Sequence, residues 1–289
     1  MALIPLRGRR ATLTVVAAVT FLMLAGATYQ GAATALERRQ YPHPGGLIDI
    51  GDRQLHLYCL GEGSPTVVLE APAAGMAAAW AWVQPEVARV TRVCSYDRAG
   101  LGWSEAGSRT YEPAAVAEQL HTLLRRAGEP GPYVLVGQGL GAAFASLFAA
   151  RFGGEVAALV LVDPPVAPGE EAAGGAGRLL TLSPWLARTG VLRATGLLSS
   201  SARGLPEPSA GALRAFLNRP DHLARAAREL SLWEETVALA QAAPLAVAIG
   251  VVRVDASGRE RLAFLTDPRR AEEVTAAITR AVAAGVRQP

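Results

Sequence analysis

Two patterns of hydrophobic and polar positions alternate along the first half of the chain. Short apolar runs predict strands, and longer amphipathic stretches predict helices. Residues 47–50 (LIDI) and 54–60 (QLHLYCL), joined by Gly51-Asp52-Arg53, predict a strand pair. Further strands are predicted at residues 66–71, 92–98, 133–137 and 158–163, with helices near 85–90, over 114–127 and through Phe152. This alternation indicates an α/β fold, a mostly parallel sheet covered by helices on both faces.

The pattern changes between residues 164 and 244. No strand is indicated there, and Ala, Leu and Arg recur at helical spacing, as at Leu213, Phe216 and Leu217. This stretch predicts an inserted helical lid. Residues 245–250 then run directly into 251–256, whereas two neighbouring parallel strands need a crossover of about a dozen residues. Residues 245–289 therefore predict one long strand, or a short strand with a bend, and a helix that begins at Asp267-Pro268.

The N-terminus predicts a membrane helix. Arg7, Arg9 and Arg10 precede an uncharged stretch over residues 11–36, and about 20 apolar residues are enough to cross a bilayer. The arginines should stay in the cytoplasm, which places the chain after Glu37 outside. Residues 1–36 are thus expected to anchor the protein in the cell membrane, followed by a linker at 37–46 and a first half-domain at 47–163. The alternative is a signal segment that is cleaved near Ala27 or Ala35, which would release a secreted protein.

Composition narrows the range of functions. The formal net charge is +3, and the basic residues are scattered rather than clustered, so nucleic-acid binding is not indicated. All the basic residues are arginine, which excludes mechanisms that need a lysine amine. No cofactor or metal site is expected. The two cysteines, Cys59 and Cys94, leave two alternatives open, a disulfide or two free thiols.

Residues 133–142 (YVLVGQGLGA) allow two interpretations. Gly137, Gly139 and Ala142 match a dinucleotide-binding turn, with Asp163 as the acidic residue after the next strand. That turn normally opens the first βαβ unit of its domain, whereas several strands precede it here. The same residues match the G-x-S-x-G elbow of hydrolases, with glycine in the place of the serine.

Other motifs favour the second interpretation. Residues 55–71 (LHLYCLGEGSPTVVLEA), 95–104 (SYDRAGLGWS), 132–141 (PYVLVGQGLG) and 159–163 (LVLVD) follow one another in the order found in α/β-hydrolases. The chain from Gly46 onward resembles this family, in the branch that carries an N-terminal membrane helix. The resemblance implies an α/β-hydrolase sandwich with a helical lid, here with a shortened C-terminal part of the sheet.

The resemblance also implies a Ser-His-Asp triad, and this chain departs from it at each position. Gly139 stands at the nucleophile position, after Gln138, and Arg259 at the position of the base. Glycine has no atom that can attack a carbonyl, and arginine stays protonated at neutral pH. Asp163 could replace the orienting acid, but its expected role is to cap a turn. No catalytic group is therefore expected to be intact.

The glycine-rich oxyanion turn of the family reads EAPAAGM here, over residues 70–76, with Pro72 where glycine is usual. The backbone N–H groups of Ala73 and Leu140 remain as candidate donors to a carbonyl or carboxylate, with Gln138 beside them. The chain has four histidines, at positions 43, 56, 121 and 222. The first three are expected to be structural or surface residues, whereas His222 lies in the lid, which can overhang the site.

These departures predict a pseudo-hydrolase, tethered to the membrane, that binds a small apolar or ester-like ligand. Two alternatives stay open. One is an active serine hydrolase or esterase with a relocated nucleophile, such as Ser104 or one of the lid serines 199–201. The other is dinucleotide binding at residues 137–142.

Overall fold

The structure, a computed structural model, describes residues 6–107, 111–165, 176–246, 249–255 and 265–285, and the side chains of α1 and α5 only from residues 11 and 182. Seven strands form one sheet in the order β1-β2-β4-β3-β5-β6-β7. Their bounds are Gly46–Asp49 (β1), Gln54–Leu60 (β2), Thr66–Glu70 (β3), Val93–Tyr96 (β4), Tyr133–Gln138 (β5), Val156–Val162 (β6) and Gly250–Val254 (β7).

The sheet is mixed and mostly parallel, as predicted. β1 pairs antiparallel with β2, and β2 antiparallel with β4. The pairs from β4 through β3, β5 and β6 to β7 are parallel. In the described residues a single strand, β7, follows the lid. It has five residues, so of the two predicted alternatives the short strand is the one observed. The prediction of a shortened sheet is confirmed.

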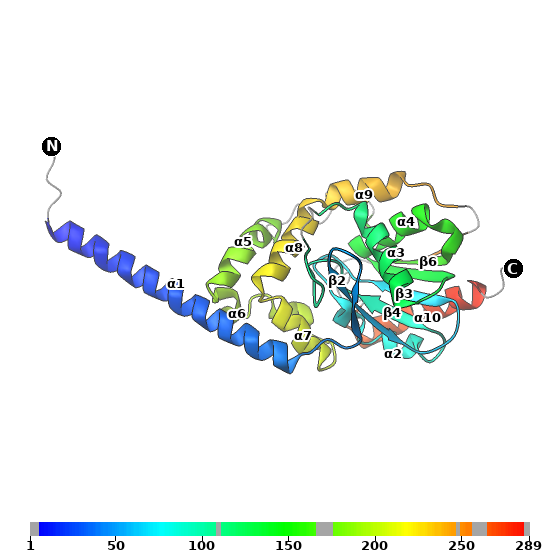
Figure 1. Cartoon of the computed structure of the whole chain (residues 1–289), viewed down its shortest axis with the longest axis horizontal. Helices are drawn as coiled ribbons and strands as arrows, with labels where there is room; N and C mark the ends of the chain where they lie inside the picture. Colours follow the sequence, from blue (N-terminus) through cyan, green and yellow to red (C-terminus); the bar gives the residue numbers. More distant parts are fainter. Residues whose placement is uncertain (1–5, 108–110, 166–175, 247–248, 256–264, 286–289) are drawn as a thin grey trace.

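Helices cover both faces of the sheet because the strand residues alternate between two apolar clusters (Figure 1). Tyr133 and Leu135 of β5 pack toward α3 (Ala115–Ala127) and α4 (Leu140–Arg151). Val134 and Val136 face the other way, toward α2 (Gln84–Val87) and α10 (Pro268–Gly285). A short turn, η1 (Ala77–Trp80), precedes α2, and η2 (Gly153–Glu155) precedes β6.

Every regular element described between β6 and β7 is a helix, as predicted for the lid. Its elements are α5 (Ala176–Arg188), α6 (Val191–Thr195), η3 (Ser199–Ala202), α7 (Ser209–Phe216), α8 (Pro220–Ser231) and α9 (Trp233–Ala242). Trp233 and Val237 of α9 pack on Leu140 and Phe144 of α4. The lid is thereby seated on the start of α4, where the elbow motif lies.

The N-terminal apolar segment forms one long helix, α1 (Leu6–Gln40), which projects from the domain (Figure 1). It extends through Gln40, so the first residues expected in the linker are helical. In the described part of the chain, it is the one helix long and apolar enough to cross a membrane. Its second half is held on the lid, where Arg193 forms an ion pair with Glu37 and donates a hydrogen bond to Gln30.

The two cysteines form a disulfide. Cys59 on β2 and Cys94 on β4 are direct partners in the antiparallel register, with 4.0 Å between their Cα atoms. This decides between the two alternatives that the sequence leaves open. The disulfide joins the β1–β2 hairpin to the parallel part of the sheet.

Candidate functional site

The elbow lies between β5 and α4. Gly139, its central residue, has φ +53° and ψ −122° and precedes the first residue of α4. Its N–H donates to the carbonyl of Val162. A positive φ is strained for residues with a side chain but costs glycine little. The chain thus makes the sharp strand-to-helix turn of a nucleophile elbow with a residue that has no side chain.

The three glycines of the motif differ in their surroundings. A Cβ on Gly137 would clash with the carbonyl of Gly141, and a Cβ on Gly141 would lie 2.6 Å from the carbonyl oxygens of Glu70 and Ala71. A Cβ on Gly139 would meet no atom within 4 Å. The flanking glycines are therefore explained by close packing between β5, α4 and β3, which requires no nucleotide. The central position has room for a side chain.

The loop after β3 is held in place by Arg98. Its guanidinium donates to the carbonyl oxygens of Ala71 (2.7 Å) and Pro72 (2.9 Å). The Gly75 N–H also donates to Pro72, which closes the turn. Ala73 packs against the same apolar cluster as Leu140, so the two candidate donors belong to segments in contact. As the first residue of α4, Leu140 has no acceptor for its N–H within the helix.

Arg98 is also the centre of a buried charge network. Its remaining N–H groups bind the carboxylates of Glu70 and Glu229, so that all five guanidinium donors are used. Burial opposes ionisation of Glu229, but Arg98 outweighs it and holds the pKa of this carboxyl below its usual value. Burial raises the pKa of Glu70, which Arg98 and the Tyr96 hydroxyl only partly offset. The network joins β3, β4 and the lid.

Sequence analysis missed this network, since Glu229 lies on α8 and far along the chain from Arg98. A signal was present at Glu70, which ends a buried and otherwise mostly apolar strand and needs a partner there. Tyr111 and Trp233 were also missed. Each carries a buried polar atom with no hydrogen-bond partner in the described part of the chain, and both belong to the cluster around Leu140.

His222 is in the lid and fully buried, and both of its ring nitrogens have partners. Nδ1 accepts a hydrogen bond from the Gly102 N–H (3.1 Å), so Nε2 carries the proton and donates to the Ala74 carbonyl (3.1 Å). Burial lowers the pKa of this imidazole, so it stays neutral. Its contacts fasten α8 to the loop after β3.

The other histidines also have partners or neighbours away from the elbow. Nδ1 of the buried His56 lies 2.9 Å from Asp97, and burial, which would lower the pKa of His56, is outweighed by this carboxylate. His121 pairs with Glu155. The ring of His43 lies next to that of His56, with 6.0 Å between centroids.

Ser104, the candidate for a relocated nucleophile, has a buried hydroxyl that is used twice. It accepts a hydrogen bond from the His56 N–H (2.8 Å) and donates to the carbonyl of Asp97 (2.6 Å). Both partners are backbone groups. The hydroxyl thus closes the turn after β4, and no imidazole is bonded to it.

The remaining candidates are placed as follows. Gln138 is buried at the end of β5, opposite Val162. Asp163 follows β6 with φ +45°, and its N–H donates to Val254 at the end of β7. Arg259, at the position of the family base, lies outside the described residues. Among the described residues, one cluster of side chains of the kinds that bind metals is found: Cys59, Cys94 and Glu129. Its two cysteines are joined in the disulfide.

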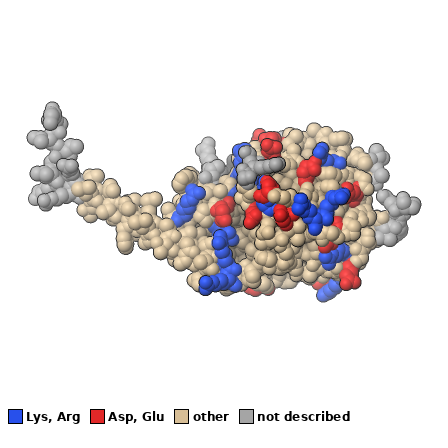
Figure 2. Space-filling model, viewed as in Figure 1, with Lys and Arg blue, Asp and Glu red and all other residues tan. Residues whose placement is uncertain are grey.

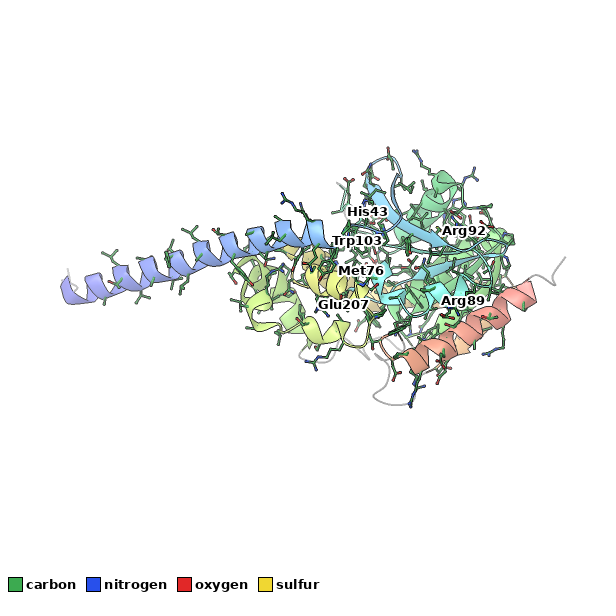
Figure 3. The ribbon with its side chains drawn as sticks, turned by 90° about the horizontal axis from the view of Figure 1, so that it is seen from below. His43, Met76, Arg89, Arg92, Trp103 and Glu207 are labelled. Carbon is green, nitrogen blue, oxygen red and sulfur yellow. A yellow bond between two sulfur atoms is a disulfide. The ribbon has the colours of Figure 1, made fainter. Side chains whose placement is uncertain are left out.

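A cavity lies away from the elbow, at the base of α1. It has a volume of about 500 Å³ and is enclosed by the chain after α1, β2, η1, α2 and the start of α7. Figure 3 shows three of its lining residues, His43, Trp103 and Glu207, grouped where α1 meets the domain. A smaller cavity of about 200 Å³ borders α4 at Ala142 and Ala143.

Comparison with known proteins agrees with this architecture. A family described as alpha/beta hydrolase fold matches residues 65–198. An uncharacterized protein of Schizosaccharomyces pombe is 41% identical over 81 residues, which cover 28% of this chain and 15% of that protein. The chain therefore covers only a small part of that protein. It covers 37% of the length of a second curated relative, an uncharacterized protein of Bacillus subtilis.

Solved structures are similar over most of the chain. An enol-lactonase from Burkholderia xenovorans superposes with a TM-score of 0.58 at 16% identity, over 82% of this chain and all of that one. A membrane phospholipase A superposes with a TM-score of 0.58 at 17% identity, over 94% of this chain and 97% of its own. At such identities the likeness establishes the fold.

Proposed function

Because this chain has the α/β-hydrolase fold, we propose that it is a membrane-tethered pseudo-hydrolase that acts by binding a small apolar or ester-like ligand. One observation carries the proposal. Position 139 keeps the backbone of a nucleophile elbow and has open space beside it, but it is glycine. Covalent hydrolysis needs an oxygen or sulfur at this point, and none is supplied.

The surroundings of the imidazoles support the same conclusion. A general base has to lie within hydrogen-bond reach of the nucleophile. The neutral His222 uses both nitrogens to fasten the lid, and His56 is paired with Asp97. Arg259, at the family position of the base, cannot accept a proton at neutral pH.

The cavity at the base of α1 is the proposed ligand site. Its volume, about 500 Å³, lies in the range of small-molecule sites, and its lining is mostly apolar with a few polar groups. The lining comprises apolar and aromatic side chains such as Tyr41, Tyr58, Leu60, Ala78 and Trp103. Acyl chains are apolar ligands of suitable shape, and a structurally similar protein is a membrane phospholipase A.

The elbow is proposed as a second, smaller binding point. The N–H groups of Ala73 and Leu140 are the candidate donors, with Gln138 beside them. The observation that favours this is the presence of Tyr111 and Trp233 in the same cluster, each with a buried polar atom that has no partner in the described residues. The Tyr111 hydroxyl and the Trp233 indole N–H can donate hydrogen bonds to a carbonyl or carboxylate. The cluster that contains them borders the cavity along α4.

We propose further that α1 is retained as an anchor and that the domain lies outside the cytoplasm. A disulfide between Cys59 and Cys94 is typical of an oxidising compartment. The helix also continues without a break from the apolar stretch to its contacts with Arg193. Recovery of the intact N-terminus in the membrane fraction is the expected result; a soluble form that begins near Ala27 or Ala35 would indicate secretion.

Ester hydrolysis tests the absence of catalysis. The full chain in lipid nanodiscs is incubated with short p-nitrophenyl esters, and release of nitrophenol equal to that of empty nanodiscs is expected. Turnover that Ser104→Ala or substitution of a lid serine abolishes would establish a relocated nucleophile instead.

Ligand binding is tested with a dansyl-labelled fatty acid. Ala81→Phe, which fills the cavity at the base of α1, should abolish the increase in dansyl fluorescence. Ala276→Phe, the same substitution at an exposed position on α10, is the control and should leave it unchanged. Equal binding by both variants and the wild type would rule out the larger cavity as the site.

A further inference from the structure

Four large apolar side chains are exposed close together in the sequence of the lid. Leu182 (58% exposed) and Trp185 (66%) are three residues apart on α5 and so share a face of that helix. Val191 (46%) begins α6, and Leu197 (57%) follows it. We call these four residues the lid face. Single exposed apolar side chains are ordinary, but several on two helices in contact, α5 and α6, offer an apolar surface that suits a contact.

The lid face adjoins α1. Gly26 packs against the backbone of Thr189, where a side chain would overlap the carbonyl oxygen. A Cβ on Gly190 would in turn lie 3.0 Å from the Gly26 carbonyl and 3.2 Å from the ring of Tyr29. The turn between α5 and α6 therefore touches α1 at Gly26. Figure 1 shows α5 and α6 at the end of the domain from which α1 projects.

The length of α1 places the membrane surface close to its contact with the lid at Gly26. Arg7, Arg9 and Arg10 stay outside the hydrocarbon core of the bilayer, so the roughly 20 residues that span it are residues 11–30. The side chains of residues 11–24 are exposed, and Figure 2 shows this projecting part without charged groups. From Gln30 onward α1 makes polar contacts with the lid, including a hydrogen bond to the Asn218 carbonyl at 2.6 Å. Gly26 thus lies about one helical turn before α1 leaves the apolar layer near Gln30.

The side chains on and beside the lid face are of the kinds found at a membrane surface. The guanidinium carbon of Arg188 lies over the Trp185 ring, 4.7 Å from the centre of that ring. Tyr29 lies beside the contact between Gly26 and Gly190. Tryptophan and tyrosine favour the membrane–water interface, and arginine binds anionic headgroups.

We propose that the lid face lies in the interfacial layer of the membrane that α1 crosses, with Arg188 at the lipid phosphates. The occupant of this surface is the bilayer, because the surface is continuous with the contact between α1 and the lid. The proposal rests on the membrane anchor proposed above and is independent of the absence of catalysis. The lid is then held by lipid as well as by Arg98 and His222.

Spin labels can measure the depth of the lid face. Both cysteines are in the disulfide, so an introduced cysteine is the single free thiol. The full chain carries one label at Leu182→Cys or Leu197→Cys, in nanodiscs of phosphatidylcholine and phosphatidylglycerol. Two controls bracket the result: Leu22→Cys on the projecting part of α1 and Val90→Cys, an equally exposed position after α2.

Labels at 182 and 197 are expected to collide more with lipid-soluble oxygen than with a water-soluble nickel complex, as at 22, and the label at 90 is expected to show the reverse. If the labels at positions 182 and 197 show the same accessibility as the label at position 90, while the label at position 22 is in lipid, the lid face is in water and only the membrane anchor is supported. If 22 is aqueous as well, the anchor fails and this proposal with it. Labels shielded from both reagents and broadened by a neighbouring spin would place a second copy on the surface and overturn the proposal.

Discussion

Arg98 and Glu229 join the sheet to the lid. Nε and Nη2 of the arginine donate to the two carboxylate oxygens of the glutamate at 2.8 and 2.9 Å, and the two side chains are 1% and 0% exposed. The pair thus forms away from solvent, with both donors aligned on one carboxylate. Such a bidentate pair fixes the orientation of both partners.

Removal of one partner should be costly because it leaves a buried charge without compensation. We expect Glu229→Ala to lower the free energy of unfolding by about 3–5 kcal/mol. Chemical denaturation of the full chain in detergent micelles measures this. Glu235→Ala, an exposed glutamate on α9, is the control and should change the stability by less than about 0.5 kcal/mol. Equal effects of the two variants would show that the network does not hold the lid.

His222 should make stability depend on pH. Because burial lowers its folded pKa, the unfolded chain binds the proton more readily, and the stability due to the neutral imidazole is lost as pH falls below about 6.5. The stability advantage of the wild type over His222→Gln should therefore shrink between pH 7.5 and 5.5, by up to about 1.4 kcal/mol per pH unit. His56 is present in both proteins and cancels. A constant difference across this range would contradict the assignment.

The glycines of the elbow should respond differently to alanine. At Gly139 the new methyl group has space, so only the positive φ is unfavourable, by about 1–2 kcal/mol. At Gly141 the methyl group would collide with the backbone of Glu70 and Ala71, and a loss of about 3 kcal/mol or more is expected. Thermal unfolding of both variants checks the order; a reversed order would mean that α4 and β3 do not pack so closely.

The disulfide should stabilise the sheet. The double variant Cys59→Ala/Cys94→Ala should lose about 2–4 kcal/mol, since its unfolded chain is no longer constrained. Dithiothreitol should lower the melting temperature of the wild type and leave that of the double variant unchanged. Identical behaviour of both proteins would mean that the two thiols are free.

Local patterns were sufficient to predict most of the fold. The β1–β2 turn, the buried runs that become β3, β5 and β6, and the start of α10 depend on neighbouring residues, so they could be located from the sequence. The prediction of one strand after the lid, which agrees with β7 in the described residues, followed from the shortness of residues 245–256. The glycine at position 139 could be read directly because the motif around it is local.

Contacts between distant segments could not be predicted in this way. The partner of Arg98 lies on α8, and the roles of His222 and Ser104 depend on how the lid and the turn after β4 pack. Whether Cys59 meets Cys94 depends on strand register, which the hydrophobic pattern leaves open. The cavity at the base of α1 is formed by residues between 40 and 103 together with residues 206–212 of the lid, so no local pattern marks it.

The central claim is that the elbow offers no nucleophile, and labelling with a serine-reactive fluorophosphonate tests it most directly. The full chain in nanodiscs is treated with the probe and its intact mass is measured, beside a serine esterase as positive control. We predict no adduct on the wild-type chain. A stoichiometric adduct on any serine would contradict the account.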